Sequence, residues 1–290
     1  MKWGRRDWPY AVIFLAPSLI GMILFTLIPI LASFGLAFTD WNLLRPPSFV
    51  GLENFRAMFS DKVMWISLRN TFYYALLIVP STIVASLALA LVLRRNFPGI
   101  AYFRLAFMIP GVSSLVAIAM VWRWLYNDQF GLINAGLQAI GLPAVGWLID
   151  PHVVIPALVL MSLWTGVGFD AIIYLAGLKN IPEHLYEAAR LDGASAWQSF
   201  RYITLPLLTP IHFFFLITGV IGAFQVFDVI YIMTKGGPGF SSNVYAFHLF
   251  NQAFRRFEVG YASAMAWFLF AIVLLLTLFQ WRTVGRKVEY

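Results

Sequence analysis

Six long apolar segments dominate the chain and limit what it can fold into. They cover residues 11–38, 70–93, 103–125, 153–178, 210–233 and 259–281. About 20 mostly apolar residues in a helix cross the hydrocarbon core of a bilayer, which is about 30 Å thick. Each segment is therefore predicted to be a transmembrane helix. The expected fold class is an all-α, polytopic membrane protein with six spans, and an even number of spans places both termini on one side.

The composition excludes an ordinary soluble domain. Of the 290 residues, 61% are hydrophobic and only 11% are charged. The sequence has no cysteine, which excludes a disulfide framework, a thiolate metal site and a cysteine nucleophile. The basic N-terminus resembles the start of a signal peptide, but the run over 11–38 is too long for one. We therefore expect a retained helix that Pro17 and Pro29 kink.

The distribution of basic residues predicts the orientation. Twelve of the 20 Lys and Arg residues lie in the segments 1–9, 94–104, 179–209 and 282–290. The positive-inside rule then places both termini and the 179–209 segment in the cytoplasm. The two longer outer segments keep apolar residues: 40–69 has the spacing of a short interfacial helix, and 126–152 is expected to fold back against the membrane. They are either surfaces for a soluble partner or plain connectors.

The segment 179–209 is the charged exception in an apolar chain. Asn180, followed three residues later by Glu183, has the spacing of a capping box. A helix over 185–191, a turn at Gly193 and a second helix over 194–204 that stops before Pro206 are predicted. Without further information, such a pair of helices is either a docking surface with small residues or an ordinary loop with solvated charges.

The spacing within this segment carries a family resemblance. Its fixed positions are Glu187, Ala188, Ala189, Gly193, Ile203, Leu205 and Pro206. The pattern resembles the loop that defines the membrane-spanning permease subunits of ATP-binding-cassette importers. The likeness covers nearly the whole chain and is strongest to the carbohydrate group, typified by maltose and glycerol-3-phosphate permeases. It is carried by LAPSLIGMILFTLIPILASFGLAFTDWN, FVGLENF, IPEHLYEAARLDGASAWQSF and FQVFDVIYIMTKGGPG.

The resemblance implies a complete assembly around this chain. Residues 1–290 would form one permease domain of the type I importer fold, in a bacterial or archaeal cell membrane. Partners would be a second, distinct permease, two cytoplasmic ATP-binding subunits that carry ATP and Mg, and an extracytoplasmic solute-binding protein. Alternating access would follow from ATP binding. The 179–209 coupling loop would dock on the ATPase through Glu187, Ala188, Ala189, Asp192, Gly193 and Ala194. His184 departs from the family pattern, where an acidic residue is usual.

The sequence lacks the motifs of an enzyme. It contains no Gly-Lys dipeptide and hence no phosphate-binding loop, so ATP must be hydrolysed elsewhere. Its four histidines form no HExxH motif, and no serine lies in a GxSxG elbow. We expect no catalytic residue, no metal site and no cofactor in this chain, although KGGPG at 235–239 superficially resembles a phosphate loop and is better explained as a turn.

Two acidic residues, Asp170 and Asp228, lie within predicted spans, where ionisable groups usually face a cavity or a partner. On a continuous helix Phe224, Gln225, Asp228 and Tyr231 share one face, and Phe227 borders it. Such a face offers a sugar both hydrogen bonds and aromatic surface. We expect these five residues to contact substrate, with Asp170 and Phe169 contributing from the fourth span. Alternatively, Asp228 pairs with the companion permease or caps an unwound turn.

Two other readings of the function remain open. In an ion-coupled secondary carrier, Asp170 and Asp228 would be the ion sites. That reading explains the acids and leaves the spacing from Glu187 to Pro206 unexplained. In the other, the importer carries a phosphorylated polyol, an amino acid or another small solute. The candidate face has no Lys or Arg, which favours a neutral sugar.

Overall fold

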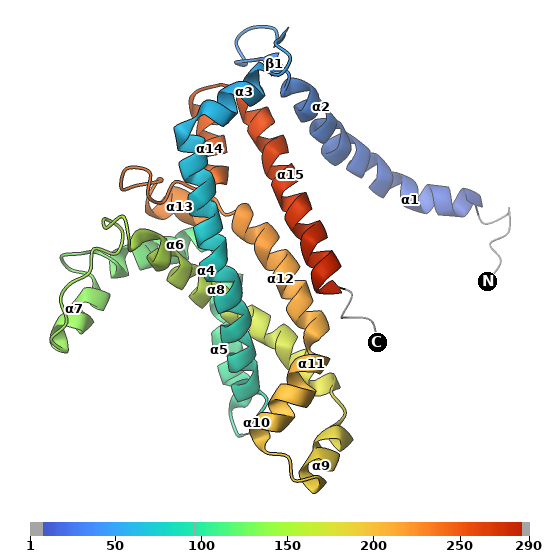
Figure 1. The fold of residues 1–290 in the computed structure, drawn as a ribbon, viewed down its shortest axis with the longest axis vertical. Helices are drawn as coiled ribbons and strands as arrows, with labels where there is room; N and C mark the ends of the chain where they lie inside the picture. Colours follow the sequence, from blue (N-terminus) through green and yellow to red (C-terminus); the bar gives the residue numbers. More distant parts are fainter. Residues whose placement is uncertain (1–7, 96, 286–290) are drawn as a thin grey trace. The chain divides into compact units, whose positions relative to one another are not determined.

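The computed structural model describes residues 8–95 and 97–285, so the two ends that the orientation rule places in the cytoplasm lie outside the described residues. The described residues form two compact units: one contains the residues up to Asp61 together with Leu249–Phe270, and the other contains the residues from Lys62 to His248 and those from Ala271 onward. Both are built mainly from helices (Figure 1). Within the described ranges, five helices are long and apolar enough to cross a membrane, or six if one bent pair counts as a single span.

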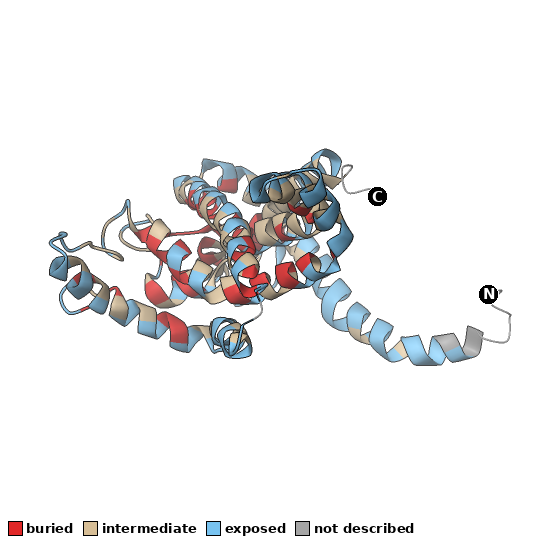
Figure 2. Cartoon of the chain, turned by 90° about the horizontal axis from the view of Figure 1, so that it is seen from below, coloured by how far each residue is buried: buried red, intermediate tan, exposed pale blue. Residues whose placement is uncertain are grey.

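The first unit begins with the predicted N-terminal span. It consists of α1 (Trp8–Met22), the π-helical turn η1 (Ile23–Leu27) and α2 (Ile28–Leu36). Pro17 lies inside α1, and Pro29 lies just after the junction of η1 and α2, where the backbone stays helical. Residues of α1 and α2 are exposed almost throughout (Figure 2). An apolar helix of this kind has its partner in lipid or in another chain.

A short hairpin and a helix complete the first unit. β1 (Thr39–Asp40) pairs antiparallel with β2 (Ser48–Phe49), and α3 (Glu53–Ser60) follows. α3 confirms that a short helix lies within 40–69. Asn54 of α3 donates hydrogen bonds to the carbonyls of Ala37 and Thr39, both at 2.9 Å, which fixes the hairpin to the end of the first span. The unit closes with η3 (Asn251–Arg255) and the first part of α15 (Val259–Thr283).

The core of the second unit lies between three long helices. These are α4 (Lys62–Leu93), α8 (Val154–Asn180) and α12 (Thr209–Phe224), and α4 packs along both of the others (Figure 1). Near one end of the three helices, a continuous apolar core is formed by Leu87, Ala90, Leu93, Ala171, Tyr174, Leu175, Leu178, Ile181, Leu208 and Phe215. Burial of such side chains holds the helices at fixed positions around whatever space lies between them.

The predicted third span is not one straight helix. It divides into α5 (Ile100–Val112) and α6 (Leu115–Leu125), whose axes differ by 96°. Pro110 near the end of α5 lacks an N–H, and Ser113 adopts an extended backbone, so the ladder of helical hydrogen bonds ends there. The expectation of a continuous helix over 103–125 was therefore wrong. α5 instead packs closely on α8, where Gly168 leaves no room for a side chain beneath the carbonyl of Phe107.

The segment 126–152 folds around a buried asparagine. It contains α7 (Leu132–Ala139). Asn134 accepts hydrogen bonds from the N–H of Val145 and from the indole of Trp147, each at 3.0 Å, and donates to the carbonyl of Val145. Trp147 in turn stacks on Tyr126, and burial raises the pKa of that phenol. The segment is thus an ordered structure held by internal hydrogen bonds. Between α13 (Asp228–Met233) and α14 (Tyr245–Phe250), the chain contains a cis peptide bond at Gly237–Pro238.

Candidate functional site

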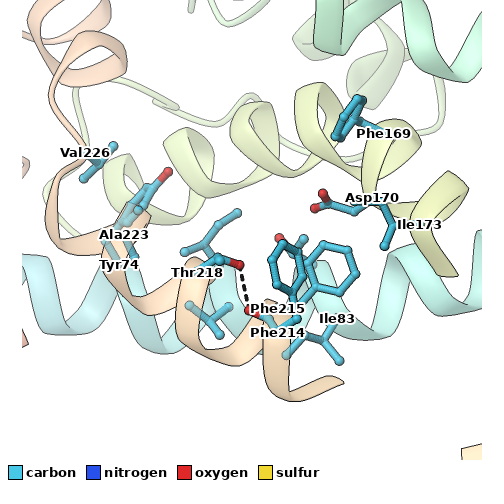
Figure 3. Close-up of a pocket in the computed structure, with 15 residues that line it drawn as sticks. Tyr74, Ile83, Phe169, Asp170, Ile173, Phe214, Phe215, Thr218, Ala223 and Val226 are labelled. Atoms are coloured by element: carbon cyan, nitrogen blue, oxygen red, sulfur yellow. Dashed lines mark hydrogen bonds between the residues drawn. The ribbon is translucent and has the colours of Figure 1, made fainter. Parts of the chain in front are cut away.

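A cavity of about 380 Å³ lies between α4, α8 and α12 of the second unit (Figure 3). Each helix contributes both apolar and polar groups to its wall. The polar side chains are Tyr74, Thr82, Asp170 and Thr218, and the aromatic rings are those of Phe169, Phe214 and Phe215. Pockets that bind small ligands combine apolar walls with a few placed polar groups in this way.

Asp170 is the acidic group of this cavity. Its carboxylate extends from α8 toward the space between α8 and α12 (Figure 3). Among the described residues, no side chain donates a hydrogen bond to it or forms an ion pair with it. Phe169 lies beside it on the cavity wall and is 50% exposed. The two residues that the sequence predicted on the fourth span therefore do face a common space.

The predicted face on the fifth span does not exist as one helical surface. α12 ends at Phe224, and α13 begins only at Asp228, so the three residues between them interrupt the helix. Phe224 is only 1% exposed, because its ring packs edge-on against Phe72 at 4.9 Å. Its placement on an open substrate face was wrong, since an edge-to-face pair of this kind belongs to the helix packing.

The other predicted residues of the fifth span lie around this break. Gln225 is the C-terminal cap of α12 and is exposed, and Asp228 is the exposed first residue of α13. Phe227 and Tyr231 stack with ring centroids 5.3 Å apart and lie near Phe247. None of these residues lines the cavity, although Val226 between them does. Asp228 thus follows an unwound turn, but it does not cap α13, because Phe227 is the N-cap and no side chain caps this helix.

The charged segment forms two short helical elements joined by a turn. α9 (Glu183–Leu191) is followed by Gly193 at φ 79°, a left-handed conformation that favours glycine. The turn at Gly193 is therefore confirmed. The expected capping box at Asn180 was wrong, because Asn180 still belongs to α8 and Pro182 precedes α9. A capping box does exist further on, where Ser195 and Gln198 exchange hydrogen bonds at the start of α10 (Ala196–Ser199).

The second helical element also runs further than expected. After α10 it continues through η2 (Phe200–Thr204) into α11 (Leu205–Leu207). The predicted stop before Pro206 was wrong, because Thr204 and Leu205 keep a helical backbone and the element continues through Pro206 to Leu207. The hydroxyls of Tyr186 and Thr204 are 2.9 Å apart and join α9 to this element. The guanidinium of Arg94, beyond the end of α4, lies 5.0 Å from the centre of the Tyr186 ring.

α9 has one packed face and one open face. Leu185 and Tyr186 pack against the apolar core of the three long helices. The six predicted docking residues lie on or beside the other face: Glu187, Ala188, Asp192 and Gly193 are exposed, and Ala189 and Ala194 are half-buried. Leu191 beside them is 89% exposed, which is unusual for leucine in a folded unit. A helix with this division presents a ready contact surface while remaining attached to the core.

The sequence interpretation missed most of the cavity residues, including two pairs at helical spacing. Tyr74 and Thr82 lie eight positions apart on α4, and Phe214 and Thr218 lie four apart on α12. These intervals place each pair on one face of its helix, so a search for hydroxyl and aromatic groups at helical spacing would have found them. They were overlooked because uncharged polar residues do not stand out in a transmembrane segment.

Residues 70–281 match the family of binding-protein-dependent transport system inner membrane components. The chain belongs to this family. Several relatives align with this chain over nearly its full length. The chain is 41% identical to the probable ABC transporter permease protein YesP of Bacillus subtilis, covering 99% of this chain and 94% of the relative. It is 32% identical to the trehalose/maltose transport system permease protein MalF of Thermococcus litoralis, over 98% and 96%.

A third relative and a solved structure complete the comparison. The chain is 34% identical to the sulfoquinovosyl glycerol transport system permease protein SmoG of Agrobacterium fabrum, over 99% of this chain and 95% of the relative. The fold superposes with a TM-score of 0.85 on a chain of a bacterial ABC transporter that imports alginate, at 24% identity and covering 98% of both chains. This likeness confirms the predicted permease fold. As a member of the family, the chain is an integral, multi-pass membrane permease.

Proposed function

We propose that this chain is one permease subunit of an ATP-driven carbohydrate importer. In this proposal it pairs with a second permease, and two ATP-binding subunits supply the energy through ATP and Mg on their own residues. A solute-binding protein delivers the sugar from outside. Support comes from family membership and from relatives whose names include trehalose, maltose and sulfoquinovosyl glycerol. The 179–209 segment faces the cytoplasm in this assembly.

The observation that carries the proposal is the open face of α9. Glu187, Ala188 and Gly193 are exposed on an element that is held to the core from its opposite face. Small residues let a partner approach the backbone closely, and the exposed Leu191 supplies apolar area for the contact. An ATPase subunit seated here would push or pull on the helix, because Gly193 and the packed face connect it to both neighbouring elements.

Packed side chains connect this surface to the cavity. Leu185 and Tyr186 touch the apolar core that includes Tyr174. Tyr174 lies on α8 one turn after Asp170, and its hydroxyl is 2.7 Å from Nδ1 of His212 on α12. Displacement of α9 would therefore act on α8 and α12, two of the three helices that form the cavity walls. Contiguous packing of this kind is the physical means by which distant sites are coupled.

The cavity is the proposed route for sugar through this subunit. Asp170 accepts hydrogen bonds from sugar hydroxyls, and Phe169 with Phe214 offers aromatic surface to the apolar faces of the ring. Gln225, Asp228 and Tyr231 contribute at the break after α12, where unwound backbone near a cavity commonly contacts transported solutes. The second permease would provide the opposite wall.

Copurification tests the coupling role directly. The tagged importer is solubilised from cells that express all its subunits, and the ATP-binding subunit that remains bound is quantified. We expect Glu187→Arg and Gly193→Asp each to lower its recovery by at least about tenfold, because a reversed charge or a strained turn at a buried contact costs more than about 1.4 kcal/mol. Asp128→Arg, at an exposed position of the 126–152 segment, is the matched control. Full recovery with both docking variants would refute the proposal.

One observation favours a second candidate function. Asp170 has no hydrogen-bond or ion-pair partner among the described residues, and an unpaired carboxylate in a cavity is also the arrangement of an ion site in a secondary carrier. Such a carrier would take up its solute in response to a proton or sodium gradient without ATP. The carrier hypothesis assigns no role to the open face of α9, whereas the importer uses both features.

A further inference from the structure

The cavity between α4, α8 and α12 contains one formal charge. None of the described residues that line it is Lys, Arg or His, and Asp170 is the acidic one. A carboxylate without a cation beside it creates a negative potential in surroundings of low polarity, where charge interactions are stronger than in water. An anion that enters this space meets repulsion that no lining residue offsets.

The hydrogen-bonding groups of the cavity point to the same selectivity. The Tyr74 hydroxyl donates to Ser162 at 2.9 Å, and the Thr218 hydroxyl donates to the carbonyl of Phe214 at 2.8 Å (Figure 3). A hydroxyl has one proton, so each of these groups retains only acceptor capacity toward a ligand. Together with the carboxylate of Asp170, they form a wall that accepts hydrogen bonds more readily than it donates them.

Tyr174 lies one turn beyond Asp170, and its hydroxyl is 2.7 Å from Nδ1 of His212. Thr82 adds one hydroxyl to the lining, and this group can donate a single hydrogen bond to a ligand. A carboxylate or sulfonate on a solute offers acceptors only and finds few donors here. Sugar hydroxyls are donors as well as acceptors and satisfy the wall, and a buried group that stays unpaired costs affinity.

We propose that Asp170 makes this part of the transport path select uncharged, hydroxyl-rich carbohydrates and disfavour acidic sugars. That the solute is a carbohydrate rests on the proposed function. The choice between neutral and anionic cargo is thereby assigned to one side chain on α8. Phe169 and Phe214, each 50% exposed, provide the stacking surface that an uncharged sugar ring uses.

The absence of cysteine from the sequence makes the local potential measurable. Thr218→Cys places one thiol on the cavity wall opposite Asp170. In the purified complete complex, its reaction rates with an anionic and a cationic methanethiosulfonate reagent are compared, after subtraction of the complex without this thiol. We expect the ratio of the cationic to the anionic reaction rate to be at least about tenfold higher than the same ratio for a free thiol in solution. One nearby negative charge speeds the cationic reagent and slows the anionic one.

Asp170→Asn is the deciding variant. It keeps the size of the side chain and removes the charge, so the preference for the cationic reagent should fall to within about threefold of the free-thiol ratio. Gln138→Cys on α7 is exposed, and its rate ratio should not respond to Asp170→Asn. The inference would be overturned if Asp170→Asn left the rate ratio at Thr218→Cys unchanged, or if this thiol reacted with neither reagent. ATP-dependent sugar uptake is measured separately, so failure of the importer proposal is recognised independently.

Discussion

Replacing Gly168 by alanine is expected to separate α5 from α8. A Cβ atom at this position would lie 1.7 Å from the carbonyl oxygen of Phe107 and 2.4 Å from its carbonyl carbon. Both atoms belong to the backbone of α5 and cannot move without the helix. An unstrained carbon–oxygen contact is about 3.3 Å, so the helices must part by about 1.6 Å. Small residues at helix contacts in membranes permit such close approach.

The same helix supplies a matched control. At Gly166 the nearest atom to an added Cβ is a carboxylate oxygen of Asp170 at 4.0 Å, which is an ordinary contact. Alanine improves helix propensity by about 1 kcal/mol at either position, so this effect cancels in the comparison. Overpacking costs about 1–3 kcal/mol, and we expect Gly168→Ala to be less stable than Gly166→Ala by that amount in free energy of unfolding.

Unfolding in mixed micelles with a rising fraction of denaturing detergent measures this difference. The importer complex carrying each variant is titrated under identical conditions, and the midpoints are compared with that of the wild type. A midpoint for Gly168→Ala equal to or above that for Gly166→Ala would refute the close packing of α5 on α8.

Two further substitutions test local structure. Asn134→Ala removes hydrogen bonds from buried partners and costs about 1–3 kcal/mol. Limited proteolysis should therefore cleave the 126–152 segment faster in this variant than in the control Gln138→Ala. Equal cleavage rates would contradict the asparagine-centred fold. Ser195→Ala removes a cap worth about 1 kcal/mol, so amide hydrogens of α10 should exchange faster than in Ser199→Ala. Unchanged exchange would mean that the capping box does not hold this helix.

Hydropathy predicted the long spans because each is an apolar run of sufficient length. α4 begins at Lys62, before the span predicted from about residue 70, because a helix can continue through polar residues that hydropathy does not count. Hydropathy also missed the bend between α5 and α6. Pro110 and the two serines after Val112 are visible in the sequence, but an average over many residues hides them.

The candidate site was predictable only in part. Asp170 and Phe169 were found because a charge within an apolar segment is conspicuous, and the turn at Gly193 because its spacing is fixed. The face through Phe224 and Tyr231 failed, since no glycine or proline marks the interruption after α12. Helical periodicity assumes a continuous helix, and tertiary packing decided otherwise.

The most direct test of the account is uptake by proteoliposomes that contain this chain with its second permease and ATP-binding subunits. The solute-binding protein loaded with radiolabelled sugar is added outside, and ATP is enclosed within. The account predicts sugar accumulation that requires ATP and is abolished by Gly193→Asp. Accumulation by this chain alone, driven by a proton or sodium gradient without ATP, would contradict it and identify an ion-coupled carrier.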